Sequence, residues 1–255
     1  MVNLAKSDEA PKIPERVHIA SVGYEIDRIV LPFRQTKGER IHLIIRKDDD
    51  ARGQKCLKAI KQELESDKKP YEIHAIDYDD LFNLIFHNRK IIGDELEKGN
   101  HVFVNISSGG NIQAAASHFA SLTFKEGVTA YYAHPKTYPE KVDSERPQRS
   151  AGLEKIQTLP NYSIELPNND HLKFMKIVAQ SEHPSKKEIR DACVKSGLIA
   201  AKGKTAPYGH VVMENKYIRP LEERGLLRVE DKGRRGRVHL TDKGTNTLRL
   251  TGLLQ

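Results

Sequence analysis

The feature that most constrains this chain is an alternation of apolar, β-branched runs with amphipathic segments over its first half. Five runs have the composition of buried strands, at 16–22, 40–46, 71–77, 101–106 and 128–133. The four segments between them carry apolar residues at helical spacing, at 24–33, 54–66, 80–98 and 111–127. Strands joined by helices form a parallel sheet with right-handed crossovers. Residues 17–134 are therefore predicted to form a Rossmann-like α/β domain, in which Pro32 either kinks the first helix or makes it begin late.

Two loops of this predicted sheet carry groups suited to a ligand. One is Gly23–Glu25 after the first strand, and the other is Asn105–Asn111, with the sequence NISSGGN, after the fourth. In such sheets, ligands bind beyond the carboxyl ends of the strands, where the strand order reverses. Adjacent glycines allow close approach, and a helix N-terminus favours an anion. A simple helix cap is the plainer reading, but so long a polar run favours a phosphate or nucleotide site.

Several common chemistries lack their motifs. The second loop has neither the GxGxxG spacing of dinucleotide dehydrogenases nor the GxxxxGK[ST] spacing of ATP-hydrolysing proteins. Cys56 and Cys193 are far apart, and the 11 histidines show no HxH or HxxxH spacing, so we expect no metal site and no disulfide. No signal peptide, anchor or membrane-spanning run is apparent, which predicts a cytoplasmic protein.

The charge of the chain is divided unevenly. Residues 171–255 carry 18 Lys and Arg against 9 Asp and Glu, a net charge of +9, whereas residues 1–170 have a net charge of −2. A mildly acidic domain followed by a strongly basic one indicates that only the second meets a polyanion, and nucleic acid is the commonest such partner.

The C-terminal third has the pattern of a winged helix-turn-helix domain. Three helical stripes, at 171–180, 185–197 and 208–224, precede two short strands and a last helix from Thr241, and Pro220 should bend or divide the third. We predict a tail at 1–16, the α/β domain at 17–134, a linker with a connecting strand at 135–169 and the winged domain at 170–255. The connecting strand is expected at 161–166.

Double-stranded DNA is the predicted partner of this basic domain. The second helix of a helix-turn-helix pair lies in the major groove, and a cationic hairpin reaches phosphates or the minor groove. The candidate contacts lie around the predicted recognition helix and on the wing: Lys202, Lys204, Tyr208, His210, Lys216, Lys232, Arg234, Arg235 and Arg237.

These parts together resemble the CARF-domain winged-helix transcription regulators of archaeal CRISPR systems, from about Arg16 to the end of the chain. The resemblance rests on the strand before Gly23–Glu25, the NISSGGN loop and the winged helix. It implies that a homodimer binds a cyclic oligoadenylate between its two copies of these loops. Carried over by position, the resemblance implicates Gly23, Tyr24, Glu25, Ser107, Ser108, Gly109, Gly110 and Asn111 as ligand-binding residues. We add Asn105, which begins the second loop, and Arg28, the cation nearest to the loops in the sequence.

The leading hypothesis is thus a ligand-responsive, DNA-binding transcription regulator with no catalytic residues and no cofactor. One alternative is a ring nuclease that degrades cyclic oligoadenylate, in which Ser107 or Ser108 and a basic residue such as Arg28 would orient the ligand and stabilise charge. The other is a homodimeric interaction module that binds no small molecule.

Overall fold

A computed structural model of the chain describes residues 13–181, 185–200, 206–231 and 236–254, and for 206–208 the backbone only. Contacts divide the chain into two compact units, one up to Ser163 and one from Ile164, called domain 1 and domain 2 below. Each is described by itself.

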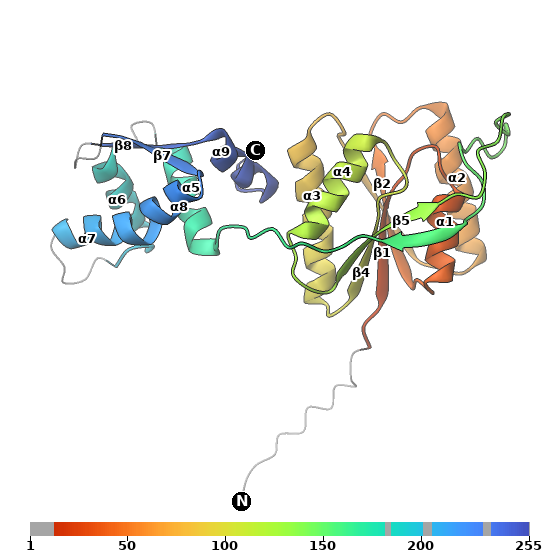
Figure 1. Cartoon of the computed structure of the whole chain (residues 1–255), viewed down its shortest axis with the longest axis horizontal. Helices are drawn as coiled ribbons and strands as arrows, with labels where there is room; N and C mark the ends of the chain where they lie inside the picture. Colours follow the sequence, from red (N-terminus) through yellow and green to blue (C-terminus); the bar gives the residue numbers. More distant parts are fainter. Residues whose placement is uncertain (1–12, 182–184, 201–205, 232–235, 255) are drawn as a thin grey trace, which may run out of the picture. The chain divides into compact units, whose positions relative to one another are not determined.

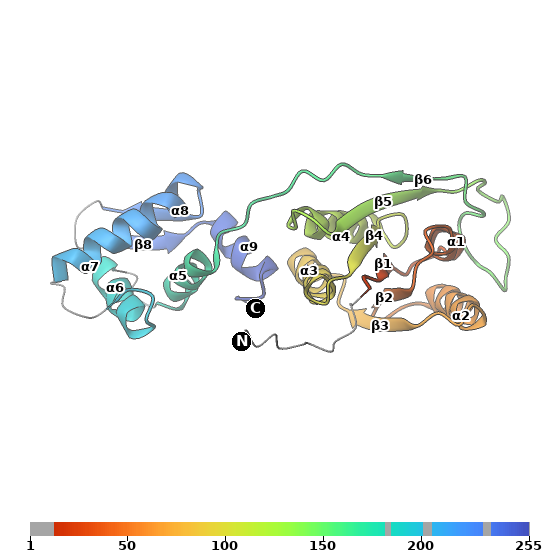
Figure 2. The same ribbon diagram turned by 90° about the horizontal axis from the view of Figure 1, so that it is seen from below.

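Domain 1 is a doubly wound α/β sheet, as predicted. Five strands are parallel, and the edge strand β6 runs antiparallel to β5, in the order β3-β2-β1-β4-β5-β6. Helices α1 and α2 cover one face, and α3 and α4 cover the other (Figures 1 and 2). The strands are β1 (Arg16–Ser21), β2 (Arg40–Arg46), β3 (Tyr71–Ile76), β4 (His101–Asn105), β5 (Val128–His134) and β6 (Lys155–Thr158), and the helices are α1 (Asp27–Gln35), α2 (Ala51–Ser66), α3 (Leu81–Glu97) and α4 (Asn111–Leu122).

Strand β1 lies at the centre of the sheet and is buried on both faces. It pairs with β2 on one side and with β4 on the other, so the strand order reverses between β1 and β4. The carboxyl ends of these two strands are therefore the switch point at which such sheets bind ligands.

Helix α1 keeps Pro32 in its interior because another side chain replaces the missing hydrogen bond. Proline has no N–H group, so the carbonyl of Arg28, four residues earlier, loses its helical partner. The buried amide of Asn105 donates to this carbonyl over 2.7 Å, and its Oδ1 accepts from the N–H of Ser107 over 2.8 Å. The helix begins at Asp27, three residues after the predicted start at 24, with Pro32 still in its interior, and Asn105 ties it to the loop after β4.

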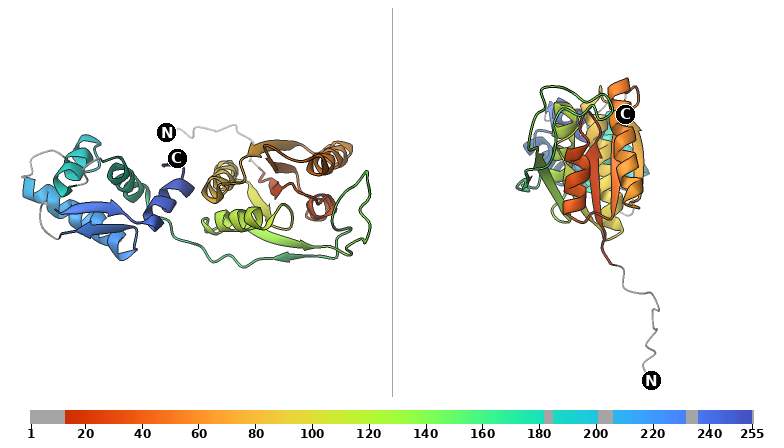
Figure 3. Two further views of the ribbon diagram at one scale, coloured as in Figure 1. Left: turned by 90° about the horizontal axis from the view of Figure 1, so that it is seen from above. Right: turned by 90° about the vertical axis from the view of Figure 1, so that its right-hand side faces the viewer.

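The segment after β5 differs from its prediction as a linker. It leaves the sheet beside α1 and α2 and returns as β6 (Figure 3). Within it, Pro147 O accepts from Arg52 Nε of α2 over 2.7 Å, and Thr137 and Ala151 pair with each other. The connecting strand predicted at 161–166 is wrong, because these residues form no strand and β6 at 155–158 takes the edge of the sheet. A strand of four residues, only one of them partly buried, carries little apolar pattern to detect.

Domain 2 is a winged helix domain, as predicted. Its core gathers residues of all its helices and both strands, with the rings of Phe174 and Tyr217 stacked 5.0 Å apart. The third helical stretch is divided as Pro220 indicated, because a π-helical turn, η1, separates α7 from α8. The elements are α5 (Asn169–Gln180), α6 (Lys186–Lys195), α7 (Ala206–Met213), η1 (Glu214–Ile218), α8 (Arg219–Glu223), β7 (Leu227–Glu230), β8 (Arg237–Leu240) and α9 (Asp242–Leu250). Among the described residues, no helix has the length and apolar character needed to cross a membrane.

Replacing Asn105 by alanine should destabilise domain 1 markedly. The substitution leaves the carbonyl of Arg28 and the N–H of Ser107 buried without partners, and each such group costs about 1–3 kcal/mol. We expect a loss of about 2–4 kcal/mol in urea unfolding followed by hydrogen exchange, with the protection lost in domain 1. The matched control Asn111→Ala removes an exposed amide and should stay within about 0.5 kcal/mol of the wild type. Equal stabilities for the two variants would contradict this role of Asn105.

Candidate functional site

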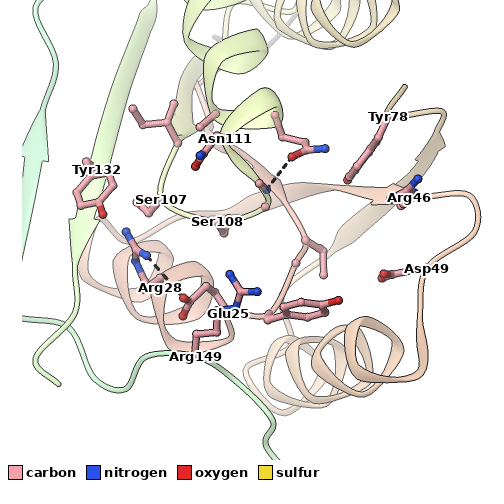
Figure 4. Close-up of a pocket in the computed structure, with 18 of the residues that line it drawn as sticks. Glu25, Arg28, Arg46, Asp49, Tyr78, Ser107, Ser108, Asn111, Tyr132 and Arg149 are labelled. Carbon is pink, nitrogen blue, oxygen red and sulfur yellow. Dashed lines mark hydrogen bonds and ion pairs between the residues drawn. The ribbon is translucent and has the colours of Figure 1, made fainter. Parts of the chain in front are cut away.

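A cavity of about 640 Å³ opens at the switch point of domain 1. Its walls come from the loops after β1 and β4, from the first turn of α4 and from residues near the ends of β2 and β5 (Figure 4). The volume lies in the range of small-molecule sites. Its lining combines backbone and hydroxyl groups with five charged side chains, which are Glu25, Arg28, Arg46, Asp49 and Arg149.

Arg28 is the buried cation of this cavity. Its Nε donates to the carbonyl of Ala133 over 2.9 Å, and its guanidinium lies 4.7 Å from the ring centroid of Tyr132. Its Nη1 is 3.7 Å from a carboxylate oxygen of Glu25, the contact drawn in Figure 4. The β5 strand and Tyr132 therefore fix the orientation of this side chain.

Two glycines hold the loops together. A Cβ at Gly23 would lie 3.0 Å from the Cα of Gly109, and a Cβ at Gly109 would lie 2.8 Å from the Cβ of Ser21. Gly109 also has φ +79°, which favours glycine. These two glycines thus serve the packing of loop on loop, whereas Gly110 is exposed and its N–H donates to Gln113 Oε1 over 2.7 Å.

A segment far along the chain completes the site. Residues 146–152, called the returning segment below, cap α1, whose own N-cap residue offers no side-chain bond. Gln148 Oε1 accepts from the N–H groups of Ile26 and Asp27 over 3.1 and 2.9 Å, and the N–H of Arg149 donates to Tyr24 O over 2.8 Å. The guanidinium of Arg149 also lies 4.9 Å from the ring centroid of Tyr24 and contributes to the cavity wall.

Unpartnered polar atoms remain at the wall. Arg28 Nη2, Ser108 Oγ and Asp49 Oδ2 are buried and have no hydrogen-bond partner among the described residues. Buried polar groups are nearly always paired in proteins, with protein, water or ligand. The backbone N–H groups, serine hydroxyls and arginines of the residues that line the cavity suit an anion or a nucleotide.

The two acids of the cavity have raised pKa values. For Glu25, burial raises the pKa, against the opposing effects of its hydrogen bond from Ser150 and the charge of Arg28. For Asp49, burial likewise raises the pKa, against the opposing effect of the hydrogen bond from the N–H of Asp50. Protonation of both acids at lower pH would leave the three arginines as the charges of the site.

The structure brings together nine of the ten residues predicted to bind a ligand. All but Asn105 line the cavity. Asn105 is 1% exposed and both ends of its amide are engaged, so it supports the loop from behind. The sequence did not point to Arg46, Asp49, Tyr78, Tyr132 or Arg149, which also line the cavity. Arg149 in particular is separated by more than 120 residues from Tyr24, which it contacts, and no local pattern could have indicated that contact.

The predicted DNA contacts have mixed outcomes. Lys202, Lys204, Lys232, Arg234 and Arg235 lie outside the described residues, as does the side chain of Tyr208. His210 Nε2 is 3.0 Å from Nη1 of Arg190 on α6, so it contacts the neighbouring helix. Lys216 is exposed, and its ammonium is 3.2 Å from a carboxylate oxygen of Asp170. Arg237 is exposed at the start of β8, at the turn end of the hairpin.

The wing is fixed to the helix-turn-helix. Strands β7 and β8 pair antiparallel, and the N–H of Lys186 at the start of α6 donates to Gly236 O over 2.9 Å. The ammonium of Lys186 is buried and reaches Glu214 over 2.9 Å, which joins α6 to the π-helical turn. These contacts join α6 to the wing and to the π-helical turn, and Lys187 of α6 and Arg237 of β8 are exposed beside them.

The fold and the cavity define a class of protein: a doubly wound α/β domain with a ligand-sized cavity at its switch point, followed by a winged helix domain. Residues 16–138 match the family described as "HFX_2341_N:-like, N-terminal", and residues 170–252 match the DUF6293 C-terminal winged helix domain. Each domain is thus similar to one described family, domain 1 to the first and domain 2 to the second. The predicted organisation, an α/β domain followed by a winged helix domain, is confirmed.

Three individual proteins illustrate the similarity. The uncharacterized protein MJ1513 of Methanocaldococcus jannaschii is 26% identical over 198 residues, which cover 69% of this chain and 59% of that protein. Enterococcus italicus Csm6, bound to cyclic hexa-2'-fluoro-hexa-dAMP, matches with TM-score 0.45 and 8% identity over 84% of this chain and 57% of its own. Can2 from Sulfobacillus thermosulfidooxidans, in complex with cyclic tetra-adenylate, matches with TM-score 0.37 and 11% identity over 93% of this chain and 64% of its own. This chain spans less than two thirds of each.

Proposed function

We propose that this chain is a ligand-responsive regulator whose domain 1 binds a cyclic oligoadenylate and whose domain 2 binds double-stranded DNA. The observation that carries the proposal is the cavity at the switch point, with three arginines and two glycine-containing loops around it. Phosphates would be held by Arg28, Arg149 and the N–H groups at the start of α4, since a helix N-terminus favours anions. Tyrosine rings at the wall, such as Tyr132, offer faces on which adenine can stack.

The proposed ligand implies a homodimer. A cavity of about 640 Å³ suits a single small molecule, whereas a ring of four or six nucleotides is larger. Two copies of the cavity facing one another across a two-fold axis would each hold half of a symmetric ring. Calorimetry should then give one ring bound per two chains.

Degradation of the same ligand is the second candidate function. It is supported by Ser108 and Arg28, which both line the cavity, because a hydroxyl and a cation are what orientation and charge stabilisation require. Ser107 suits this role less well, because its hydroxyl oxygen already accepts the N–H of Ala133. Incubating the protein with the cyclic ligand and separating products by chromatography distinguishes the two functions. A regulator without this activity returns the intact ring.

Removing Arg149 should weaken ligand binding. Its side chain lines the cavity from the returning segment, and a charge-assisted contact is worth about 1.5–3 kcal/mol. We expect Arg149→Ala to lower the affinity for cyclic tetra- or hexa-adenylate by about 10- to 150-fold in calorimetry. The control Lys141→Ala removes an exposed cation that precedes the returning segment and does not line the cavity. An equal loss in both variants would point to a general effect of net charge instead.

Ligand affinity should rise as the pH falls below neutrality. An ionised Glu25 repels a phosphate, and because burial raises the pKa of this carboxyl, it takes up its proton at a higher pH than an ordinary glutamate. A bound anion raises that pKa further, so proton uptake accompanies binding. Glu25→Gln should bind more tightly at pH 7 and show a flatter pH profile. A wild-type affinity that is constant with pH would contradict this.

Removing Arg237 should weaken binding to duplexes of any sequence. The logarithm of DNA affinity falls linearly with the logarithm of the salt concentration, and each lost phosphate contact makes this fall less steep by about one unit. The control Lys173→Ala removes an exposed lysine of α5, outside the helix-turn-helix pair and the wing.

The DNA titration of the wild type should be repeated with saturating cyclic ligand at fixed salt, where coupling of about 1–3 kcal/mol between the two sites changes DNA affinity about 5- to 150-fold. Unchanged affinity with ligand bound would refute regulation of domain 2 by domain 1.

A further inference from the structure

A second cluster of polar side chains lies on the sheet of domain 1, away from the cavity. In the parallel pairing of β2 with β3, His42 is opposite Glu72 and Ile44 is opposite His74. Residues two apart on a strand face the same side of a sheet, so His42, Glu72 and His74 share one face. The cavity is lined by Arg46 at the end of β2, four residues and about 13 Å along the strand from His42.

Three potential ligand atoms converge in this cluster. Nδ1 of His42 is 2.9 Å from Nε2 of His74 and 3.7 Å from Oε2 of Glu72. The atoms that these residues offer all lie within 4.8 Å of one another. Two nitrogens bonded to one tetrahedral ion at about 2.05 Å would be about 3.3 Å apart, so the rings need to separate by about 0.4 Å.

A buried carboxylate lies behind His42. The other ring nitrogen, Nε2, is buried without a hydrogen bond and lies 3.4 Å from Oε1 of Glu95. Glu95 is 1% exposed and is held by Arg40 at 2.6 Å, by Lys98 at 2.7 Å and by Asn100 at 2.8 Å. Metal-binding histidines almost always donate their second N–H to such a group. With an ion bound, Nε2 would donate to Glu95, and Nδ1 would bind the ion in place of its present hydrogen bond with His74.

We propose that His42, Glu72 and His74 form a Zn²⁺ site on the edge of the sheet, with Glu95 positioning the ring of His42. Two imidazoles and one carboxylate are a ligand set that zinc uses with water in its fourth position. Oxygen-preferring ions such as Mg²⁺ are disfavoured because two of the three ligands are nitrogens. Bound zinc would clamp the edge strand β3 to β2. This site is independent of the cavity and of the function proposed for it.

The test is calorimetry of the untagged full-length protein with Zn²⁺, with Mg²⁺ as the control ion. Wild type should bind one Zn²⁺ per chain, and Zn²⁺ should raise its melting temperature, because an ion that binds only the folded state stabilises it. Glu72→Gln and His74→Gln each remove a ligand from the edge strand, where both side chains are at least partly exposed. We expect each to weaken zinc binding by at least about tenfold, since loss of an outer partner alone costs 10- to 100-fold.

The matched control is His134→Gln. It removes a partly exposed histidine from β5 of the same domain, where the side chain contacts Gln157. This variant should bind zinc as the wild type does. Circular dichroism establishes that each variant is folded. Zinc binding that is equal in wild type and His74→Gln, or that is absent from the wild type, would overturn the proposal.

Discussion

The candidate site depends on one hydrogen bond, from the amide of Asn105 to the carbonyl of Arg28. Pro32 leaves that carbonyl without its helical partner, and a buried carbonyl without a partner would oppose folding. By supplying the donor, Asn105 joins the end of β4 to α1, and its Oδ1 shapes the loop through the N–H of Ser107. Arg28 is thereby held with its guanidinium between Ala133 and the cavity. An irregularity in one helix thus determines where the cation of the site lies.

The parts of the molecule that the sequence predicted are those with local patterns. Five strands, four helices and the winged domain follow from periodicity, caps and turn residues, and the two loops follow from their place after β1 and β4. The features that the sequence could not predict depend on contacts between residues far apart in the chain. Gln148 caps a helix more than 120 residues away, and Arg149 reaches the cavity with it. His42 and His74 belong to different strands, so their spacing in the chain resembles no ligand motif and could not indicate that they lie together.

The cavity is less cationic than its arginines alone imply. Arg28 and Glu25 are 3.7 Å apart, and Asp49 adds a second acid to the wall. A site built only of cations would bind any polyanion, including the DNA that domain 2 is proposed to bind. Acids with raised pKa values oppose anions that lack compensating contacts, and so favour a ligand whose shape fills the cavity.

The returning segment gives the domain an order of assembly. The start of α1 is capped by residues of 146–152, so the first helix of the chain is completed only when the chain beyond β5 has folded back onto it. Closing so long a loop costs entropy that the early sheet contacts must offset. During synthesis, the central strands can pair before the ligand site exists. A proteolytic cut between β5 and the returning segment would leave Arg149 at the cavity only through the pairing of β6 and the contacts with the start of α1.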